Sequence, residues 1–263
     1  MKALILAAGY ATRLYPLTQK RAKPLLPVGD RPILDYIVDA LDATGQVRQI
    51  MVVSNHHFVD QFKSWREAHP LSARIHIVDD GSRSSSDRRG AIGDIDFVIQ
   101  KERVKEDLLV VAGDNLFRFG LSGFLESAQD RSPHITVGVV DIRDRLAARR
   151  FGIVTLGDAH RVTAFFEKPV RPPTSLVAIG LYYFPKPTLP LVRQYLKLAS
   201  RKDEPGHYIH WLVEQGSVYG FVFKDRWYDI GDLDAYEKAT REYGLLARHK
   251  GGRHAQGEVP LHL

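Results

Sequence analysis

Cysteine is missing from the 263 residues of this chain, and its absence excludes several kinds of site. Without a thiol the protein can have no disulfide framework, no thiolate metal centre and no cysteine nucleophile. Long apolar runs are missing too, since no stretch approaches the ~20 residues needed to span a bilayer. The N-terminus starts directly with an apolar segment and lacks the charged region and cleavage site of a signal peptide. We therefore expect a cytoplasmic protein that does not contact a membrane.

Two widespread nucleotide-binding patterns are also missing. The chain contains neither GxxxxGK[ST] nor a glycine set with the spacing GxGxxG after its first strand. Negative charge is in the minority, because 37 Lys and Arg residues stand against 31 Asp and Glu residues, which gives a net charge of +6. The basic residues are scattered along the sequence rather than packed in one block. This distribution favours small phosphorylated ligands and argues against nucleic acid as a partner.

What is present is the alternation of an α/β fold. Short, mainly apolar segments at 3–7, 49–54, 74–78 and 108–115 are typical of strands buried on both faces, and residues 33–41 have the spacing of an amphipathic helix ending near Gly45. Such β-loop-α-β-α-β order predicts a Rossmann-like fold, with a mixed, mainly parallel central sheet flanked by helices. The length suits one domain over residues 1–245, divided near residue 118, with a flexible tail over 246–263.

The second half of the chain predicts a β-rich region. Residues 151–154 and 161–166 form a predicted hairpin around 157–160, and 135–140, 178–184 and 218–223 read as further strands. Residues 189–198 and 207–213 are predicted helices, with a turn at 204–206 between them. Asp232 or Asp234 is expected to cap a last helix, with Glu237 completing a capping box from Asp234.

The stretch Lys2–Val28 attracts most attention. Its strand runs into a loop of small residues that ends in Arg13, and Lys23 follows in a second loop. Backbone N–H groups of such a loop can approach a phosphate chain while nearby Arg and Lys side chains neutralise its charge. Taken alone, the loop fits an ordinary strand-to-helix turn with Arg13 and Lys23 on a solvated surface equally well.

The motif LAAGYATRLYPLT followed by KPLLPV resembles the signature of the sugar-1-phosphate nucleotidyltransferases, or NDP-sugar pyrophosphorylases. The resemblance covers about the first tenth of the chain. It implies that Arg13 stabilises the leaving β- and γ-phosphates and that Lys23 bridges the α-phosphate and the sugar phosphate. It also implies a triphosphate loop made of Ala8, Gly9, Tyr10, Ala11 and Thr12. One departure is clear, because Ala11 stands where the family usually has a second glycine.

Six later segments resemble functional segments of the same family. DDGS and GAIGDI resemble its base-reading segments, which implies that the base is bound by Asp80, Gly81, Gly90 and Gly93. GDN and WYDIG resemble its two metal-binding segments, which implies Mg²⁺ on Asp114 and Asp229. FGIVTLGDAHRVTAFFEKP and AIGLYYF resemble its sugar-phosphate block, which implies roles for Gly152, Glu167, Lys168, Gly180 and Tyr182.

The resemblance implies a nucleotide-diphospho-sugar transferase fold of the GT-A-like kind, with a nucleotide-binding half over 1–118 and a sugar-binding half over 119–245. The implied reaction condenses an NTP with a sugar 1-phosphate to give an NDP-sugar and pyrophosphate. We take dTTP or UTP with glucose 1-phosphate as the first pair to consider. No hexapeptide repeat is present, so the C-terminal β-helix domain of some members is not expected.

Three alternatives stay open on the sequence. A cytidylyltransferase could act on a non-sugar phosphate such as phosphocholine. A metal-dependent glycosyltransferase could use Asp79-Asp80 as its metal motif, although Arg13 and Lys23 argue against it. A non-catalytic sensor could bind a nucleotide sugar, which Ala11 leaves open. The oligomeric state, including a homo-oligomer, is open as well.

Overall fold

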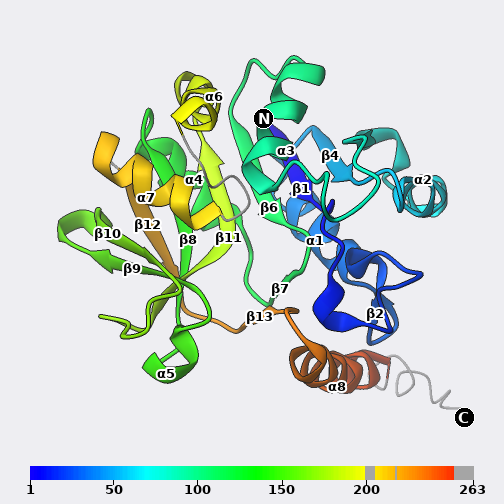
Figure 1. Ribbon diagram of the computed structural model, residues 1–263. Coiled ribbons are helices and arrows are strands. Elements are labelled where there is room, and N and C mark those ends of the chain that lie inside the picture. Colours follow the sequence, from blue (N-terminus) through cyan, green and yellow to red (C-terminus); the bar gives the residue numbers. More distant parts are fainter. Residues whose placement is uncertain (199–204, 217, 252–263) are drawn as a thin grey trace, which may run out of the picture.

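The computed structural model describes residues 1–198, 205–216 and 218–251 of the chain (Figure 1). A mixed sheet of nine strands runs through both halves, with the path β10-β9-β11-β6-β1-β4-β5, while β8 pairs with β11 and β12 pairs with β8. The first half contributes β1 (Lys2–Leu6), β4 (Gln49–Ser54), β5 (Ile75–Asp79) and β6 (Leu108–Ala112). The second half contributes β8 (Ile135–Asp141), β9 (Gly152–Leu156), β10 (Val162–Glu167), β11 (Leu176–Phe184) and β12 (Val218–Phe223).

The four strands of the first half are parallel to one another. β1 lies between β4 and β6, and its residues Ala3, Leu4 and Ile5 have no exposed surface. A strand covered on both faces needs an uninterrupted apolar run, which is why these segments do not alternate between apolar and polar residues. Because parallel strands end at the same edge, the loops that follow β1 and β6 lie side by side, with Leu6 opposite Ala112.

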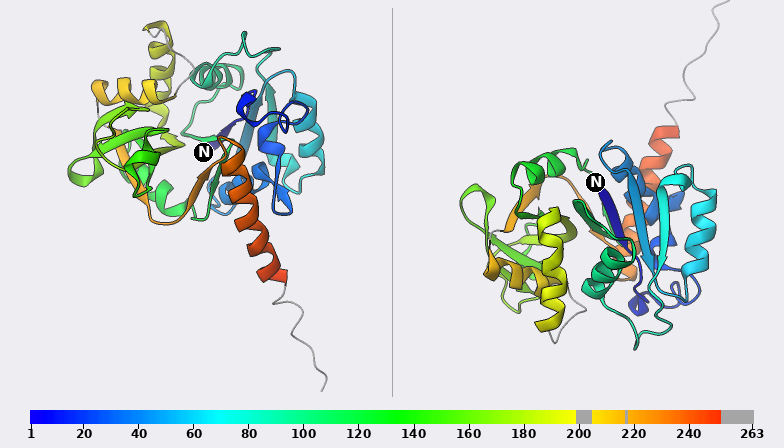
Figure 2. Two further views of the ribbon diagram at one scale, coloured as in Figure 1. Left: turned by 60° about the horizontal axis from the view of Figure 1, so that its bottom comes forward. Right: turned by 90° about the horizontal axis from the view of Figure 1, so that it is seen from above.

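Helices cover both faces of this sheet, as the two turned views show (Figure 2). Ala3 and Ile5 of β1 face one core, which also holds residues of the helices α1 (Ile33–Asp42), α2 (Val59–Ala68), α4 (Ser122–Asp130), α5 (Arg145–Ala148) and α8 (Leu233–Gly251). Leu4 faces the opposite core, shared with α3 (Ala91–Lys101), α6 (Leu189–Leu198) and α7 (Pro205–Gln215). The two-residue period of the strand therefore sorts its side chains between two helix layers.

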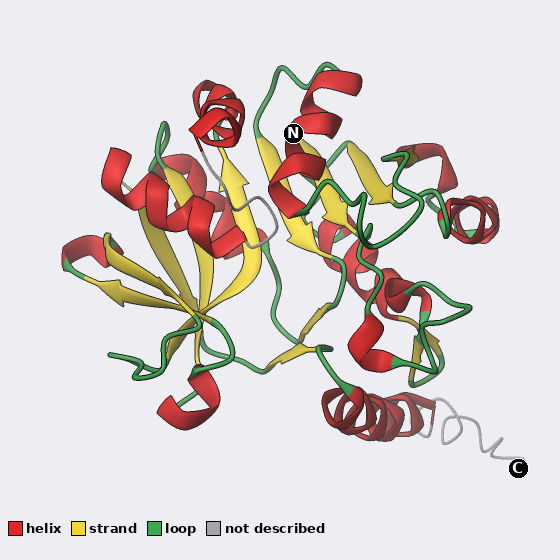
Figure 3. Cartoon of the chain, in the orientation of Figure 1, coloured by secondary structure: helices red, strands yellow, loops and turns green. Residues whose placement is uncertain are grey.

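The second half is mainly antiparallel and joins the first through β11, which pairs with β6 (Figure 3). β9 and β10 form the predicted hairpin, with a short 3₁₀ segment, η4 (Asp158–His160), in its loop. Gly180 has a φ of +66° and lies where the pairing of β11 with β8 shifts register between Ala178 and Tyr182. This irregularity lets one long strand serve both parts of the sheet.

Two small sheets complete the fold. β7 (Asn115–Phe117) follows β6 and pairs antiparallel with β13 (Trp227–Asp229), so a late segment of the chain lies against its middle. β2 (Pro27–Val28) pairs with β3 (Arg31–Pro32). The remaining 3₁₀ segments are η1 (Thr12–Leu14), η2 (Lys23–Leu25), η3 (Ser72–Arg74) and η5 (Lys186–Thr188).

The predicted fold class, a mixed and mainly parallel sheet flanked by helices, is confirmed. Three local predictions need correction. α7 begins at Pro205, so Pro205 and Gly206 open a helix instead of forming a turn; proline suits the first helical turn, where its missing N–H is not needed. Glu204, also placed in that turn, lies outside the described residues.

At the start of α8 one of the two predicted caps is confirmed but the capping box is not, and the end of the helix differs from the prediction. Asp232 caps the helix, because its Oδ1 accepts a hydrogen bond from the Ala235 N–H at 3.0 Å. The expected box from Asp234 to Glu237 is therefore wrong. The helix backbone continues to Gly251, beyond the predicted start of a tail at residue 246. Within the described ranges, every helix is too short or too polar to cross a bilayer.

Candidate active site

A cavity of about 500 Å³ lies where β1 and β6 end. Ligands of such sheets bind beyond the carboxyl ends of parallel strands, and this cavity occupies that position. Ten of the sequence-predicted site residues line it: Ala8, Gly9, Tyr10, Ala11, Thr12, Arg13, Lys23, Gly90, Asp114 and Lys168. The structure thus gathers residues from five separate segments around one space.

The loop after β1 has a defined backbone. Ala11 adopts the left-handed conformation, with φ +48° and ψ +42°, and its carbonyl accepts a hydrogen bond from Thr18 Oγ1 at 2.8 Å. Asn55 is fully buried and donates its Nδ2 hydrogen to the Ala8 carbonyl at 2.9 Å. The loop is therefore fixed at both ends. The methyl group of Ala11 does not prevent the turn that a second glycine would make, although a left-handed alanine is strained.

Lys23 opens η2 and reaches across the cavity to the loop after β6. Its Nζ lies 2.6 Å from Asp114 Oδ2 and 3.0 Å from the Ile230 carbonyl oxygen. The lysine side chain is 15% exposed and the aspartate side chain 28%. Sequence reasoning predicted both residues for the site, and the structure places them in direct contact.

Asp229 lies beside Asp114 because of the β7–β13 pairing. Asp229 is opposite Asn115, and the next residue, Ile230, donates its N–H to the Asp114 carbonyl at 3.0 Å. Burial and then the negative charge of Asp114 raise the pKa of Asp229 to about 6, against the opposing effect of Lys23 and Arg13. Two neighbouring carboxylates of this kind are stabilised by added positive charge.

This pair fits a divalent cation. Carboxylate oxygens are the ligands that Mg²⁺ prefers, and Mg²⁺ is commonly held by one or two carboxylates together with substrate phosphates. Within the described ranges no group of three or more His, Asp or Glu side chains is arranged to hold a metal ion. Asp114 and Asp229 would therefore hold the ion only together with oxygens of a bound ligand.

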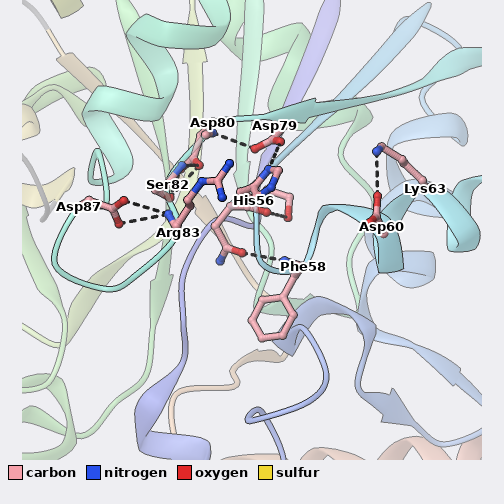
Figure 4. A network of polar contacts seen from close by, with 12 residues as sticks. His56, Phe58, Asp60, Lys63, Asp79, Asp80, Ser82, Arg83 and Asp87 are labelled. Carbon is pink, nitrogen blue, oxygen red and sulfur yellow. Dashed lines mark hydrogen bonds and ion pairs between the residues drawn. The ribbon is translucent and has the colours of Figure 1, made fainter.

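The predicted base-reading loop is held by its own side chains (Figure 4). Asp80 is 1% exposed and accepts hydrogen bonds from the N–H and the hydroxyl of Ser82 at 2.7 Å each. Asp87 accepts from the N–H of Ser84 at 2.7 Å. Burial opposes ionisation of Asp79, but hydrogen bonds with His56 and the Gly81 N–H lower its pKa below the usual value. The carboxylate of Asp80 thus supports the loop and does not line the cavity.

Tyr10 links the phosphate loop to this second loop. Its hydroxyl donates to the Ser82 carbonyl at 3.3 Å, and its ring lies 6.5 Å from that of Phe58. Gly81, with φ +82°, turns the chain, and Gly93 lies inside α3 next to Arg89. Neither Gly81 nor Gly93 lines the cavity.

The second half supplies Lys168 and, behind it, Glu167. Lys168 has a φ of +45°, and its Nζ is 3.2 Å from Glu167 Oε1. Glu167 is packed against Gly206 at the start of α7, where an added Cβ would lie 1.7 Å from Oε2. At Gly152 a Cβ would lie 2.4 Å from the Phe165 ring. The need for glycine at 152 therefore comes from packing against Phe165 in this structure.

Gly180 and Tyr182 lie deeper, beneath the cavity. A Cβ on Gly180 would come within 2.8 Å of the Ala112 Cβ and 2.9 Å of Asn115 Nδ2. Tyr182 is 6% exposed. Burial, followed by the charges of Glu167 and Asp114, raises its pKa well above the usual value. Both residues support the site from below, and neither lines the cavity.

Nine further lining residues were not predicted for the site, among them Arg88, Ala91, Asp94 and Pro205. Arg88 belongs to a Ser- and Arg-rich loop, in which the sequence gives no sign of which arginine faces inward. Asp94 lies in the first turn of α3 and is only 6% exposed. Pro205 was interpreted as part of a turn. A proline followed by a helical pattern is a start signal that could have identified it.

Comparison with known proteins indicates the family of this chain. The family model described as nucleotidyl transferase matches residues 2–244. The bifunctional protein GlmU of Methanocaldococcus jannaschii is 28% identical over 233 residues, which cover 88% of this chain and 51% of that protein. This chain thus spans about half the length of the curated relative it matches.

A solved structure has the same fold. It is a protein of Bacillus anthracis, assigned as a glucose-1-phosphate thymidylyltransferase and crystallised with sucrose. Its TM-score is 0.79, with 20% identity over 93% of this chain and 95% of that chain. With the family model matched across almost the whole described domain, this chain belongs to the nucleotidyl transferase family, as its resemblance to the sugar-1-phosphate nucleotidyltransferases predicted.

Proposed function

We propose that this protein condenses an NTP with a sugar 1-phosphate and releases pyrophosphate, with Mg²⁺ as its metal ion. The observation that carries the proposal is the contact between Lys23 and Asp114 at 2.6 Å, in a cavity that the loop from Ala8 to Arg13 also lines. A cation, a carboxylate and a loop of small residues around one space are the parts that phosphoryl transfer needs.

The chemistry requires charge stabilisation more than proton transfer. An oxygen of the sugar phosphate attacks the α-phosphorus, the bond from the α-phosphorus to the bridging oxygen breaks, and pyrophosphate leaves. The attacking phosphate is already an anion near neutral pH, so no general base is needed. The difficulty is the approach of two anions, which preorganised positive groups reduce.

Each basic residue of the site has a task in this scheme. Arg13, beside the loop, stabilises the charge that develops on the leaving pyrophosphate. Lys23 contacts the α-phosphate and the incoming sugar phosphate from its position next to Asp114. Lys168, from the second half, holds the sugar phosphate, while Glu167 accepts hydrogen bonds from sugar hydroxyls. When bound on Asp114 and Asp229, Mg²⁺ supplies further charge neutralisation at the α-phosphate.

The nucleotide base is assigned to the end of the cavity formed by Arg88, Gly90 and Ala91. Tyr10, hydrogen-bonded to the Ser82 carbonyl, connects the phosphate loop to the loop that leads to Arg88. Thymine or uracil nucleotides are the first candidates. The assignment of the Bacillus anthracis structure as a glucose-1-phosphate thymidylyltransferase supports dTTP with glucose 1-phosphate as the first pair.

The test is a panel of dTTP, UTP, CTP, ATP and GTP against glucose 1-phosphate and phosphocholine, with Mg²⁺, in which pyrophosphate release is measured. We expect release with a sugar phosphate and with dTTP or UTP. If pyrophosphate is released only from CTP with phosphocholine, the acceptor substrate is phosphocholine and not a sugar phosphate. Absence of pyrophosphate in every pair, while nucleotide sugars still bind, would favour a sensor over an enzyme.

A further inference from the structure

A second cavity lies between α3 and α6, apart from the candidate active site. Its volume is about 560 Å³, and its lining residues are all different from those of the first cavity. One wall is the end of α3 with the segment that leads to β6, and the other is η5 with α6. α3 belongs to the first half of the chain and α6 to the second, and the two helices pack against each other. Their positions can be followed in Figure 1. The groove therefore lies at the junction of the two halves.

Five basic side chains and no acidic one line this groove: Arg103, Lys105, Lys186, Arg193 and Lys197. All five are exposed. Arg193 Nη2 lies 3.1 Å from Asp96 Oδ2. The other four make no ion pair within the described part of the chain. They come from two segments about 80 residues apart, so the fold gathers charge that is scattered in the sequence.

The floor of the groove is apolar. Ile99, Val104 and Leu189 line it and are 7%, 6% and 6% exposed. Long basic side chains often lay their stems over such a floor while their charged ends stay in water. Here, however, they surround a hollow of the size that takes small organic ligands. Positive charge at the rim and apolar surface below suit a ligand with phosphates at one end and a flat or apolar body at the other.

We propose that this groove is a second ligand site that binds a small organic diphosphate or triphosphate of the nucleotide type. The phosphates contact the ends of Lys105, Lys186 and the neighbouring basic residues, and the base or a similar flat group covers the floor. A nucleic acid would need a longer basic surface, and here the charges converge on one hollow between two helices. The inference does not depend on the reaction proposed above.

The test uses the fluorescent diphosphate TNP-ADP as probe at constant ionic strength. Because the active site also binds nucleotides, the titrations are done in the Arg13→Ala/Lys23→Ala background. We expect this protein to keep one class of probe site. Adding Lys105→Glu/Lys186→Glu should weaken probe binding at least ~10-fold, since two favourable charges become repulsive.

A matched control is Lys224→Glu/Lys238→Glu in the same background, which changes the net charge equally at exposed positions outside both cavities. It should change probe affinity less than ~3-fold. If the groove pair unfolds the protein by circular dichroism, the milder pair Arg103→Gln/Lys197→Gln takes its place. Equal effects of the groove and control pairs, or no probe binding in the starting background, would overturn the inference.

Discussion

Ala11 holds a backbone conformation that alanine adopts at a cost. Its φ of +48° lies in the left-handed region, which costs an L-residue ~1–2 kcal/mol and glycine almost nothing. Replacing Ala11 with glycine removes this strain but adds up to ~1 kcal/mol of unfolded-state entropy. We expect Ala11→Gly to be as stable as the wild type or more so, as measured by urea denaturation.

Two further variants serve as comparisons for that measurement. Ala11→Val should destabilise by more than ~1 kcal/mol, because a β-branched side chain fits the left-handed region poorly. Ala40→Gly, in the last turn of α1, should destabilise by up to ~1 kcal/mol, as glycine does in ordinary helices. If Ala11→Gly lowers the free energy of unfolding as much as Ala40→Gly does, the loop backbone at Ala11 is not strained.

Lys23 is the residue on which turnover should depend most directly. We expect Lys23→Ala to lower kcat at least ~100-fold, by analogy with the loss of one preorganised charge contact. Pyrophosphate release under saturating substrates measures it, and Lys224→Ala, an exposed lysine outside the cavity, is the control. Near-normal turnover in a folded Lys23→Ala protein would remove this lysine from the proposed mechanism.

Asp229 should weaken the metal-free protein above pH 6. Burial and Asp114 raise its pKa to about 6, so the folded state favours the protonated acid. The stability that the protonated acid provides is therefore fully present below the unfolded-state pKa of the carboxyl group. It is lost as the pH rises through about 6, because the folded protein must then hold a buried charge. At pH 8, Asp229→Asn should stabilise the metal-free protein by up to ~3 kcal/mol, and below pH 4 the gain should vanish.

Magnesium should narrow or reverse the difference in stability between Asp229→Asn and the wild type at pH 8. A cation bound by Asp114 and Asp229 stabilises the folded state of the wild type by mass action, so Tm should rise with Mg²⁺ at pH 8. Asp229→Asn removes one of the two carboxylates, and its Tm should respond much less. An equal Mg²⁺ response in both proteins, measured by calorimetry, would place the metal elsewhere.

Among the structural elements, β11 depends most on a single glycine. Gly180→Ala would force a left-handed φ on alanine and bring its Cβ within 2.8 Å of the Ala112 Cβ. It would also press on Asn115, whose side chain bonds the Ile179 carbonyl at 2.7 Å and Trp227 Nε1 at 2.6 Å. We expect a loss of more than ~2 kcal/mol in the free energy of unfolding.

The control for this element is Gly120→Ala, where an added Cβ meets nothing within 4 Å. It should change stability by less than ~0.5 kcal/mol. A tolerated Gly180→Ala would mean that β6 and β11 can separate slightly at no cost.

Elements with strong periodicity were predictable from the sequence. β4 and α6 have the predicted bounds, β1 and β5 are each shifted by one residue, and β6 ends at Ala112, three residues before the predicted end. Their apolar runs are needed wherever a strand is covered on both faces, so composition alone identifies them. The loop to Arg13, with Lys23 and Asp114, follows from motifs that stand next to such strands.

Contacts between distant short segments were not predictable in the same way. β7 and β13 have three residues each, too few to show a period, yet their pairing places Asp229 beside Asp114. Pro205 was misread because proline and glycine mark both turns and helix starts. The inward orientation of Arg88 depends on the loop conformation, which local sequence does not encode.

At the scale of the whole molecule, the shared sheet should make the two halves unfold together. β6 pairs with β1 on one side and with β11 on the other, so a single strand belongs to both halves. We expect one transition by differential scanning calorimetry, with calorimetric and van't Hoff enthalpies in agreement. Two separate transitions would show that the halves are independent domains.

The pairing of β13 with β7 also sets an order for biosynthesis. A ribosome releases the loop with Arg13 and Lys23 first and Asp114 later, but Asp229 only after more than 200 residues have emerged. Until then β7 has no antiparallel partner, and the carboxylate pair is incomplete. A nascent chain can therefore fold its parallel sheet early, while the pair of acids forms only when the last strand arrives.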